Sequence, residues 1–442
     1  METKNNKLLF LFWEVRHLLI AVFIFSIILY NRWQPLENDI TKRLPHDALK
    51  FVMYKNKKSN KLDIVQMREI VKERNDLQQV RNLKNFGPIK NNTLILVISV
   101  GKFVYNLKYL IASLSQVKGI EDTLLIFSHW YLDENVDNII ISIEFARVLQ
   151  IYYPYSIQLF PREFPGYNFH DCPYYMRMKT AEANNCTGAF NPDLHGRYRH
   201  PGRAEKKHHW WWTANRVFEC LRCTANHEGL VLFLQDDFYI LDDFIYMVSR
   251  MTKIATSFYR CDFLSLGTDC FSNYASSMSY IVELQTWNPE HHSSVFGFNA
   301  VVWNNIASRY NLFCSIDDSS WSRSLFYVSS SRKDGKGYKV LSSTLPRAFK
   351  ISNRVSGSWL RRDVTENVLK VLDFRQNIHQ ELFPPFIETY VHLNLELDEY
   401  VSYDFGKSVG GWNDPRDKML CRNITESKIK KVLLDMQNVI SN

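Results

Sequence analysis

The sequence predicts an α/β protein whose mixed, mostly parallel sheet is flanked by helices, and three observations support this. First, three short and continuous apolar runs lie at residues 94–100, 124–128 and 230–234. Second, the first two runs are followed by segments with helical spacing of their apolar residues, at 105–117 and 136–149. Third, strand and helix alternate as in βαβ units, whose strands are buried on both faces of a parallel sheet.

The 442 residues exceed what one typical core needs, so we expect further segments around this α/β domain. Apolar residues make up 46% of the chain and aromatic residues 14%, which argues against disorder. The net charge of +8 is spread along the chain, and no zinc-finger, RNP or other nucleic-acid motif is present. The sequence therefore predicts a globular protein that does not bind nucleic acid.

The apolar run LLIAVFIFSIILY at residues 18–30 carries no charge and predicts a membrane anchor. It is shorter than the about 20 residues of a typical span, but the thin membranes of the early secretory pathway accept shorter spans. A cleaved signal peptide is the alternative, although no small-residue cleavage site follows the run. Basic residues precede the run and predict a single-pass type II orientation, while Arg32, Lys42 and Arg43 on the far side weaken that signal.

Residues 34–90 are polar and charged, which is typical of a stem between an anchor and a domain. Apolar residues recur every three or four positions between residues 62 and 83, which predicts a helix there. A helical stem is compatible with a coiled contact, and therefore with a homodimer through the stem. The expected organisation is a cytoplasmic tail at 1–17, a signal anchor at 18–33, the stem at 34–90 and a lumenal domain at 91–442.

Glycosylation sequons and cysteines agree with an oxidising lumen. Sequons begin at Asn91, Asn185 and Asn423. The even number of eight cysteines suits disulfides in such a compartment. The Cys220-x-x-Cys223 pair has no second such pair and no histidine pair to complete a zinc site, so a structural disulfide or free thiols are favoured there.

The third apolar run ends directly at Gln235-Asp236-Asp237. Ligands of parallel sheets bind at the carboxyl ends of the strands, so these residues are the first candidates for a site. A carboxylate there can bind a divalent cation that also binds two phosphate oxygens and neutralises a leaving diphosphate. The alternative is a solvated turn, because pairs of acidic residues often end strands.

Longer strings within residues 93–422 carry a resemblance to a known family. They include residues 125–129, 156–161, 163–166, 171–173, 207–212 (KHHWWW), 229–237, 264–268 and 410–412 (GGW). On these strings the chain resembles the N-acetylglucosaminyltransferase II family, as a divergent member. These are Golgi enzymes that add β1,2-linked N-acetylglucosamine to the α1,6-arm mannose of N-glycans. The resemblance implies a GT-A fold, UDP-N-acetylglucosamine as donor, an N-glycan acceptor on glycoproteins, Mn²⁺, an inverting displacement and a Golgi membrane location.

Cysteine pairs carry over from the family in part. The resemblance implies the disulfides Cys172–Cys186 and Cys314–Cys421. Cys261 is retained without its family neighbour, and its pairing stays open between Cys270, Cys220 and Cys223.

The chain departs from the family pattern where the metal and the donor phosphates are expected. Asp237 corresponds to the metal ligand, whereas Lys350 stands where the family has its histidine ligand. A protonated lysine does not ligate a metal, but it could place a positive charge near the phosphates instead. Asp236 is expected at the ribose, and Gln235 replaces one acid of the family's Glu-Glu-Asp triplet.

The uridine pocket and the catalytic base differ as well. Phe103 and Trp130 take the places of an arginine and an aspartate, so aromatic contacts would replace polar discrimination. Trp321, the first residue of the family's Trp-Asp-Trp stretch, is retained and is expected to bind the donor. Ser322 stands at the position of the family's catalytic base. Losing a positioned base typically costs about 10²- to 10⁴-fold in rate. Asp317 or Asp318, just upstream, could substitute for the base, and Asp318 is the chosen candidate.

The sequence therefore predicts an inverting β1,2-N-acetylglucosaminyltransferase of complex N-glycan biosynthesis. The alternative is a catalytically impaired pseudoenzyme of the same fold that binds a glycan or a partner glycosyltransferase. A glycosidase is less favoured, because it needs two positioned carboxylates that flank a cleft.

Overall fold

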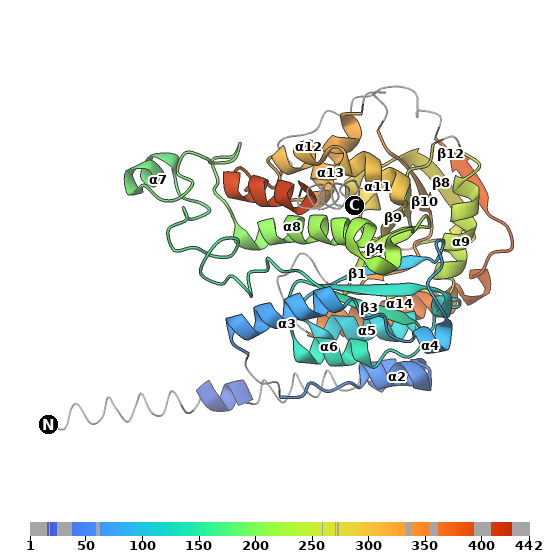
Figure 1. Ribbon diagram of the computed structural model, residues 1–442. Helices are drawn as coiled ribbons and strands as arrows, with labels where there is room; N and C mark the ends of the chain where they lie inside the picture. The colour runs from blue at the N-terminus through green and yellow to red at the C-terminus, as the bar shows by residue number, and fades with distance from the viewer. Residues whose placement is uncertain are drawn as a thin grey trace, which may run out of the picture.

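The computed structural model describes residues 16, 18–23, 38–58, 62–258, 260–269, 271, 274–332, 337–352, 361–392 and 408–426 (Figure 1). Over these residues the protein is a mixed α/β structure with one large sheet and one small sheet. The large sheet has the strand order β12-β8-β10-β6-β9-β4-β1-β2-β3, and the small sheet has the order β5-β11-β7.

The strands have the following bounds. The large sheet consists of β1 (Ile95–Val100), β2 (Leu124–His129), β3 (Arg147–Tyr152), β4 (Val231–Gln235), β6 (Phe263–Ser265), β8 (Ile281–Thr286), β9 (Phe296–Phe298), β10 (Lys339–Ser343) and β12 (Glu388–Val391). The small sheet consists of β5 (Phe238–Ile240), β7 (Gly267–Thr268) and β11 (Ala348–Lys350). The predicted strands at 94–100, 124–128 and 230–234 are confirmed as β1, β2 and β4.

The centre of the large sheet is parallel, as the alternation of strands and helices predicted. Strand β1 pairs in parallel with β2 and with β4, and β2 pairs in parallel with β3. Strand β9 runs antiparallel to both β4 and β6, which makes the sheet mixed. Because β1, β2 and β4 are parallel neighbours, their carboxyl ends meet at one edge of the sheet.

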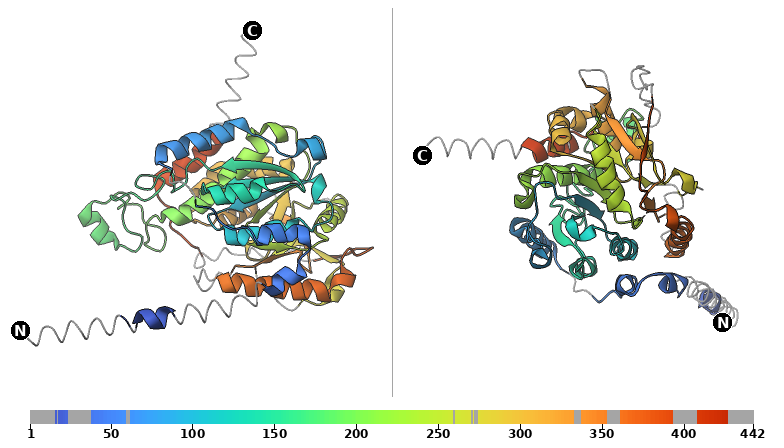
Figure 2. Two further views of the ribbon diagram at one scale, coloured as in Figure 1. Left: turned by 90° about the horizontal axis from the view of Figure 1, so that it is seen from below. Right: turned by 90° about the vertical axis from the view of Figure 1, so that its right-hand side faces the viewer.

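Helices cover both faces of the large sheet (Figures 1 and 2). Alternate residues of β1 separate the two cores, since Leu96 and Ile98 face one and Ile95 and Val97 face the other. The first core includes residues of α2 (His46–Val52), α5 (Val104–Leu114), α6 (Glu134–Ile141), α9 (Phe244–Ala255) and α14 (Arg361–Asn377). The second includes residues of α8 (Pro201–Asn215), α11 (Ala300–Ala307), α12 (Tyr310–Ser315) and α13 (Trp321–Ser330).

One predicted helix is partly wrong. The segment 136–149 was expected to be a single amphipathic helix, but α6 ends at Ile141 and β3 begins at Arg147. Side chains of β3 are buried nearly throughout, because β3 lies in the sheet beside β2. A short apolar run of this kind fits a helix or a buried strand equally well, so spacing alone did not separate them.

The segment predicted as a stem contains the expected helix and packs on the domain. Helix α3 (Ile64–Leu77) begins with a capping box, in which the Asp63 carboxylate accepts a hydrogen bond from the Gln66 backbone N–H and the Gln66 side-chain oxygen accepts one from the Asp63 backbone N–H. Phe51 of α2 is buried in the first core, and Lys108 of α5 donates a 2.8 Å hydrogen bond to the carbonyl of Val52. The division of the chain into tail, anchor, stem and lumenal domain stays a prediction.

The anchor expected at residues 18–33 falls largely outside the described residues. Only residues 18–23 of it are described. Within the described ranges, no helix is long and apolar enough to cross a membrane.

Both disulfides implied by the resemblance are present. Cys172 pairs with Cys186, and Cys314 pairs with Cys421. Cys220, Cys223 and Cys261 form no disulfide with a described residue, and Cys270 lies outside the described residues. The asparagines of the three predicted sequons, Asn91, Asn185 and Asn423, are exposed, as glycosylation requires.

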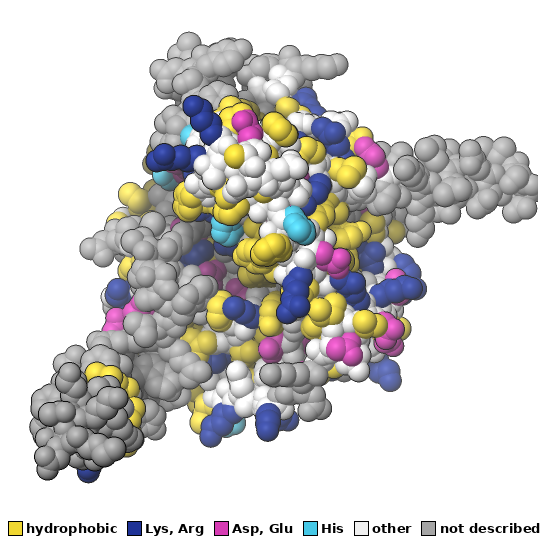
Figure 3. All heavy atoms as spheres, turned by 90° about the vertical axis from the view of Figure 1, so that its left-hand side faces the viewer, with side chains coloured by type: hydrophobic (Ala, Val, Ile, Leu, Met, Phe, Trp, Pro, Cys, Tyr) yellow, Lys and Arg dark blue, Asp and Glu magenta, His cyan; other side chains and the backbone are white. Residues whose placement is uncertain are grey.

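The Cys172–Cys186 disulfide lies in a lobe that projects to the left of the sheet in Figure 1 and includes α7 (Met178–Asn184). Phe169 and Tyr175 of this lobe are 95% and 80% exposed. Figure 3 faces this side of the molecule and shows hydrophobic, basic and histidine side chains intermixed. The lobe therefore presents aromatic rings to solvent within a surface of mixed character.

The KHHWWW and GGW strings meet in the structure and hold the loop that leads into α13. Lys207 is fully buried, donates to the carbonyls of Ile316 (3.2 Å) and Asp318 (2.8 Å), and lies 3.9 Å from the ring centroid of Trp412. Trp412 in turn donates to the carbonyl of Cys314 at 2.8 Å. Packing therefore accounts for these two conspicuous strings.

Replacing Gly410 by Ala should destabilise the protein by about 2–5 kcal/mol, the sum of left-handed strain and overpacking. Gly410 has φ +62°, and a Cβ on it would lie 2.0 Å from Oδ2 of the buried Asp193. Chemical unfolding of the two proteins measures the difference. Gly196→Ala is the matched control, because Gly196 has φ +70° and open space around it, so only strain is expected there. Equal losses in the two variants would show that the contact with Asp193 does not matter.

Candidate functional site

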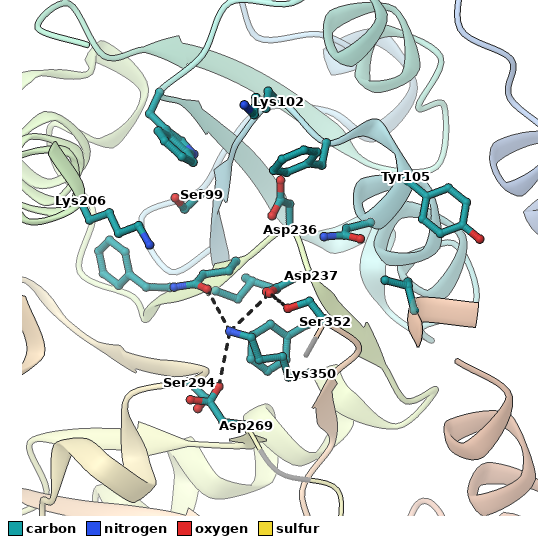
Figure 4. Close-up of a pocket in the computed structure, with 18 of the residues that line it drawn as sticks. Ser99, Lys102, Tyr105, Lys206, Asp236, Asp237, Asp269, Ser294, Lys350 and Ser352 are labelled. Atoms are coloured by element: carbon teal, nitrogen blue, oxygen red, sulfur yellow. Dashed lines mark hydrogen bonds and ion pairs between the residues drawn. The ribbon is translucent and has the colours of Figure 1, made fainter. Parts of the chain in front are cut away.

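A cavity of about 1670 Å³ lies at the carboxyl ends of the parallel strands. Ser99 of β1, Trp130 after β2 and Asp236 after β4 all line it. Figure 4 shows Ser99, Asp236, Asp237 and Lys350 converging on this space. Among the described residues, the seven lysines and arginines that line the cavity outnumber the five aspartates and glutamates, so the cavity suits an anionic ligand.

Asp236 is tied to the end of β1. Its backbone N–H donates to the carbonyl of Ser99 at 3.1 Å, and its carboxylate accepts a 2.9 Å hydrogen bond from the backbone N–H of Gly101. Burial, together with the neighbouring Asp237 carboxylate, raises the pKa of Asp236 to about 7. The carboxylate is thus held in the cavity wall, where the resemblance places the ribose of the donor.

Asp237 and Lys350 form an ion pair beside it. Strand β11 pairs antiparallel with β5 and sets Lys350 opposite Phe238, the residue after Asp237. The Lys350 ammonium lies 3.3 Å from Oδ2 of Asp237 and 3.8 Å from Oδ1 of Asp269, and it donates to Oε1 of Gln235 at 3.3 Å. The Lys350 side chain is only 6% exposed. Gln235 and Asp237 at the end of β4 therefore meet Lys350 of β11 and Asp269, which follows β7, in one charged cluster. Figure 4 shows Asp237, Asp269 and Lys350 of this cluster.

The residues of this cluster do not fit the Mn²⁺ that the resemblance implies. The second ligand position is held by an ammonium, which is a donor and not a metal ligand. Over the described ranges, no group of three or more His, Cys, Asp or Glu side chains is arranged to hold a metal ion. A divalent cation on Asp237 would lie beside the Lys350 ammonium, and two positive charges at such short range repel each other.

The two aromatic positions of the expected uridine pocket also line the cavity. Phe103 precedes the first residue of α5, and Trp130 follows β2. Trp130 packs on the backbone of Gly101, where an added Cβ would lie 3.0 Å from its ring. The structure therefore brings Phe103 and Trp130 to the same cavity as Gln235 and Asp236.

Trp321 and Ser322 begin α13 and also line the cavity. The Trp321 ring stacks on Trp210 of α8, with ring centroids 4.5 Å apart and planes inclined by 7°. The Ser322 hydroxyl lies 3.1 Å from the Ser320 hydroxyl, within a helix start that the Ser320 side chain caps. The position of the family base is therefore in the cavity, but it carries no carboxylate.

The expectation that Asp318 substitutes for the base is wrong. It is fully buried and is absent from the cavity wall among the described residues. Its Oδ1 accepts from the Ser320 backbone at 2.7 Å, and its Oδ2 accepts from the Val409 backbone at 3.3 Å. These contacts fix the loop before α13, so the Asp318 carboxylate is occupied and does not reach the site.

The structure adds a carboxylate that sequence reasoning missed. Glu290 lies in the first turn of α10 (Pro289–His292), which packs against α13, and it lines the cavity. Its Oε1 is 3.5 Å from a guanidinium nitrogen of Arg323, the residue after Ser322, and its side chain is 50% exposed. Asn288-Pro289-Glu290 carries the signal of a helix start. No sequence signal connects residue 290 with residue 322.

The contribution of His209 to the free energy of unfolding should fall as the pH drops below about 6.5, the ordinary pKa of histidine. His209 is buried beside the cavity, with Nε2 2.9 Å from the Ser128 hydroxyl, and burial followed by the nearby His129 lowers its pKa to about 3. Between these two pKa values, His209 is protonated in the unfolded chain but stays neutral in the folded protein. Each such histidine contributes a slope of up to about 1.4 kcal/mol per pH unit between the two pKa values. Urea unfolding at pH 7.5, 6.5 and 5.5 measures it, and His209→Gln should reduce the slope by one proton.

Comparisons with known proteins agree on one family. The family model for N-acetylglucosaminyltransferase II matches residues 68–421. The human alpha-1,6-mannosyl-glycoprotein 2-beta-N-acetylglucosaminyltransferase is 31% identical over 358 residues, which cover 80% of this chain and 78% of the human protein. The rat protein of the same name is 32% identical over 80% of this chain and 79% of its own length. The Arabidopsis thaliana protein of that name is 34% identical over 246 residues, which cover 54% of each chain.

Among solved structures, Staphylococcus aureus TarS 1-349 aligns with a TM-score of 0.31 and 9% identity, over 58% of this chain and 60% of that chain. The family match covers most of the chain, including the strand ends that form the cavity. On the family model and on these relatives, the chain belongs to the N-acetylglucosaminyltransferase II family.

Proposed function

We propose that this protein transfers N-acetylglucosamine from UDP-N-acetylglucosamine, in β1,2 linkage, to the α1,6-arm mannose of N-glycans. The observation that carries the proposal is the cavity at the strand ends, with Asp236 and Asp237 in its wall, in a chain of this family. A GT-A fold for this domain is part of the proposal, supported by the parallel centre of the sheet and by the acidic residues after β4. Family membership disfavours the pseudoenzyme alternative.

Glu290 is proposed as the catalytic base. The acceptor hydroxyl loses its proton to the Glu290 carboxylate while its oxygen forms a bond to the anomeric carbon. The bond from that carbon to the diphosphate oxygen breaks, and the electron pair leaves with UDP. Attack opposite the leaving group inverts the anomeric centre. Glu290 suits this role because it lines the cavity next to the first turn of α13, where Ser322 replaces the family base.

The stacked pair of Trp210 and Trp321 supplies a flat apolar wall beside this base. Sugar rings present apolar C–H faces that pack well on such indole rings. The pair is therefore proposed to orient the transferred sugar between the diphosphate end at Asp237 and the base at Glu290.

A transfer assay tests the proposed function. The full chain, purified in detergent, is incubated with UDP-N-acetylglucosamine and an N-glycan whose α1,6-arm mannose is free, and the product linkage is determined by NMR. The expected product carries one added β1,2-linked N-acetylglucosamine on that mannose. An acceptor without the α1,6-arm mannose is the matched control and should remain unchanged. Absence of any product at high enzyme concentration would contradict the proposal.

A Golgi location, with a type II anchor and a lumenal domain, is proposed together with this activity. The support is the apolar run at residues 18–30, the two disulfides and the three exposed sequon asparagines. A homodimer through the stem and glycosylation at Asn91, Asn185 and Asn423 also remain proposals. Removal of N-glycans from the expressed protein should lower its apparent mass in three steps, and crosslinking in membranes should report on the dimer.

A further inference from the structure

We propose that the Lys350 ammonium, rather than a divalent cation, neutralises the diphosphate of the sugar nucleotide, so that donor binding does not require a metal. This inference rests on the proposed transferase function and concerns the same cavity. It differs from the Mn²⁺ dependence that the family resemblance implies.

The Lys350 ammonium already lies among the carboxylates of the site. It stands between the carboxylates of Asp237 and Asp269 at 3.3 and 3.8 Å, at the end of β4 (Figure 4). Ser352 also donates a hydrogen bond to Oδ2 of Asp237. The Asp237 oxygen that faces the cluster is therefore already satisfied by an ammonium and a hydroxyl. A diphosphate bound at the strand ends would therefore lie beside the Lys350 ammonium.

Contacts on several sides hold β11, which carries Lys350, in place. Arg347, on the same short segment as Lys350, is fully buried and donates both to the Asp243 carboxylate (2.9 and 3.0 Å) and to the carbonyl of Ser279 (2.7 Å). Strand β11 is also paired on both sides, with β5 and with β7. Lys350 is thus held in place before any ligand binds, which is the preorganisation that electrostatic catalysis needs.

The charge of the site is consistent with an ammonium in place of a metal. Gln235, where the family has an acid, removes one negative charge from the strand end and contacts Lys350 at 3.3 Å. Lys102 and Lys206 line the same cavity and appear around it in Figure 4. When the anomeric carbon–oxygen bond breaks, the extra negative charge stays on UDP. The Lys350 ammonium is placed to stabilise that charge without itself losing or gaining a proton.

Donor binding tests the proposal by isothermal titration calorimetry. The full chain in detergent is titrated with UDP-N-acetylglucosamine in EDTA and again in Mn²⁺. We expect the same Kd in both conditions. Lys350→Gln should weaken binding about 10- to 100-fold in EDTA, the range for loss of a charged hydrogen bond. Lys253→Gln is the matched charge control, since Lys253 is exposed on α9 outside the cavity wall, and it should bind as the unchanged protein does.

Metal uptake provides a readout that is independent of activity. Electron paramagnetic resonance measures free Mn²⁺ in a solution of Mn²⁺ and UDP, and this signal should not change when the protein is added. Lys350→His restores the family's ligand type at this position, and we expect this variant to take up Mn²⁺ with UDP and to bind donor more tightly in Mn²⁺ than in EDTA. Circular dichroism of each variant verifies that it is folded.

The outcomes separate the two proposals. Donor binding that EDTA abolishes and Mn²⁺ restores in the unchanged protein would overturn the role of Lys350 and leave the transferase function standing. An unchanged Kd in folded Lys350→Gln would overturn it as well. If the unchanged protein binds no UDP-N-acetylglucosamine with or without Mn²⁺, both proposals fail.

Discussion

Glu290→Gln is expected to lower kcat by about 10²- to 10⁴-fold while changing the donor Kd by no more than about twofold. Glutamine keeps the size of the side chain and its place in the first turn of α10, but it cannot accept the proton of the acceptor hydroxyl. Because Glu290 lies at the wall of α13 and not at the Asp237 cluster, the diphosphate end of the donor should be unaffected. Initial rates at saturating donor and acceptor measure kcat, and calorimetry measures the Kd.

Glu228→Gln is the matched control for this experiment. Glu228 is exposed and lies outside the cavity wall, so the same chemical change there should leave kcat as it is. A normal kcat in Glu290→Gln would remove Glu290 as the base. The search would then turn to Asp363, a carboxylate of α14 that also lines the cavity.

Asp243→Ala is expected to destabilise the protein by about 3–5 kcal/mol, because it leaves a buried guanidinium without its carboxylate. Asp243 and Arg347 are both fully buried, and Arg347 donates to both oxygens of Asp243. The same carboxylate accepts from the Phe383 backbone at 3.3 Å. Loss of the Asp243 carboxylate would therefore make β11 less rigid and the position of Lys350 in the cavity less well defined.

Urea unfolding of the full chain in detergent measures this effect, and Asp242→Ala is the neighbouring control. Asp242 pairs with Arg375 at 2.6 Å, but both side chains are about one fifth exposed. Water screens that pair, so we expect a loss nearer to 1 kcal/mol there. Similar losses of unfolding free energy in the two variants would show that the buried pair stabilises the fold no more than the partly exposed pair does.

Much of the sheet could be predicted from the sequence. Strands β1, β2 and β4 are continuous apolar runs bounded by polar residues, and such runs bury both faces wherever they lie in a sheet. Helix α3 followed from the spacing of its apolar residues. The error at 136–149 arose because β3 is apolar enough to continue a helical pattern, and only its pairing with β2 makes it a strand.

Part of the site was also predictable. Asp236 and Asp237 had to lie at a strand end, because they follow an apolar run without a gap. The family strings indicated where metal, donor and base are expected, and the structure brings Phe103, Trp130 and Ser322 to one cavity. Asp318 was wrong, because nearness in sequence to the base position says nothing about which way a side chain points.

The sequence by itself determined the local elements, the family and the chemical types available at each strand end. Only the tertiary structure decided which of these side chains meet. Lys350 reaches Asp237 because β11 pairs with β5 across more than a hundred residues of chain, and Glu290 joins the wall at Ser322 because α10 packs on α13. Local patterns record whether a segment is buried and how its residues repeat, whereas contacts between distant segments depend on how the whole core packs.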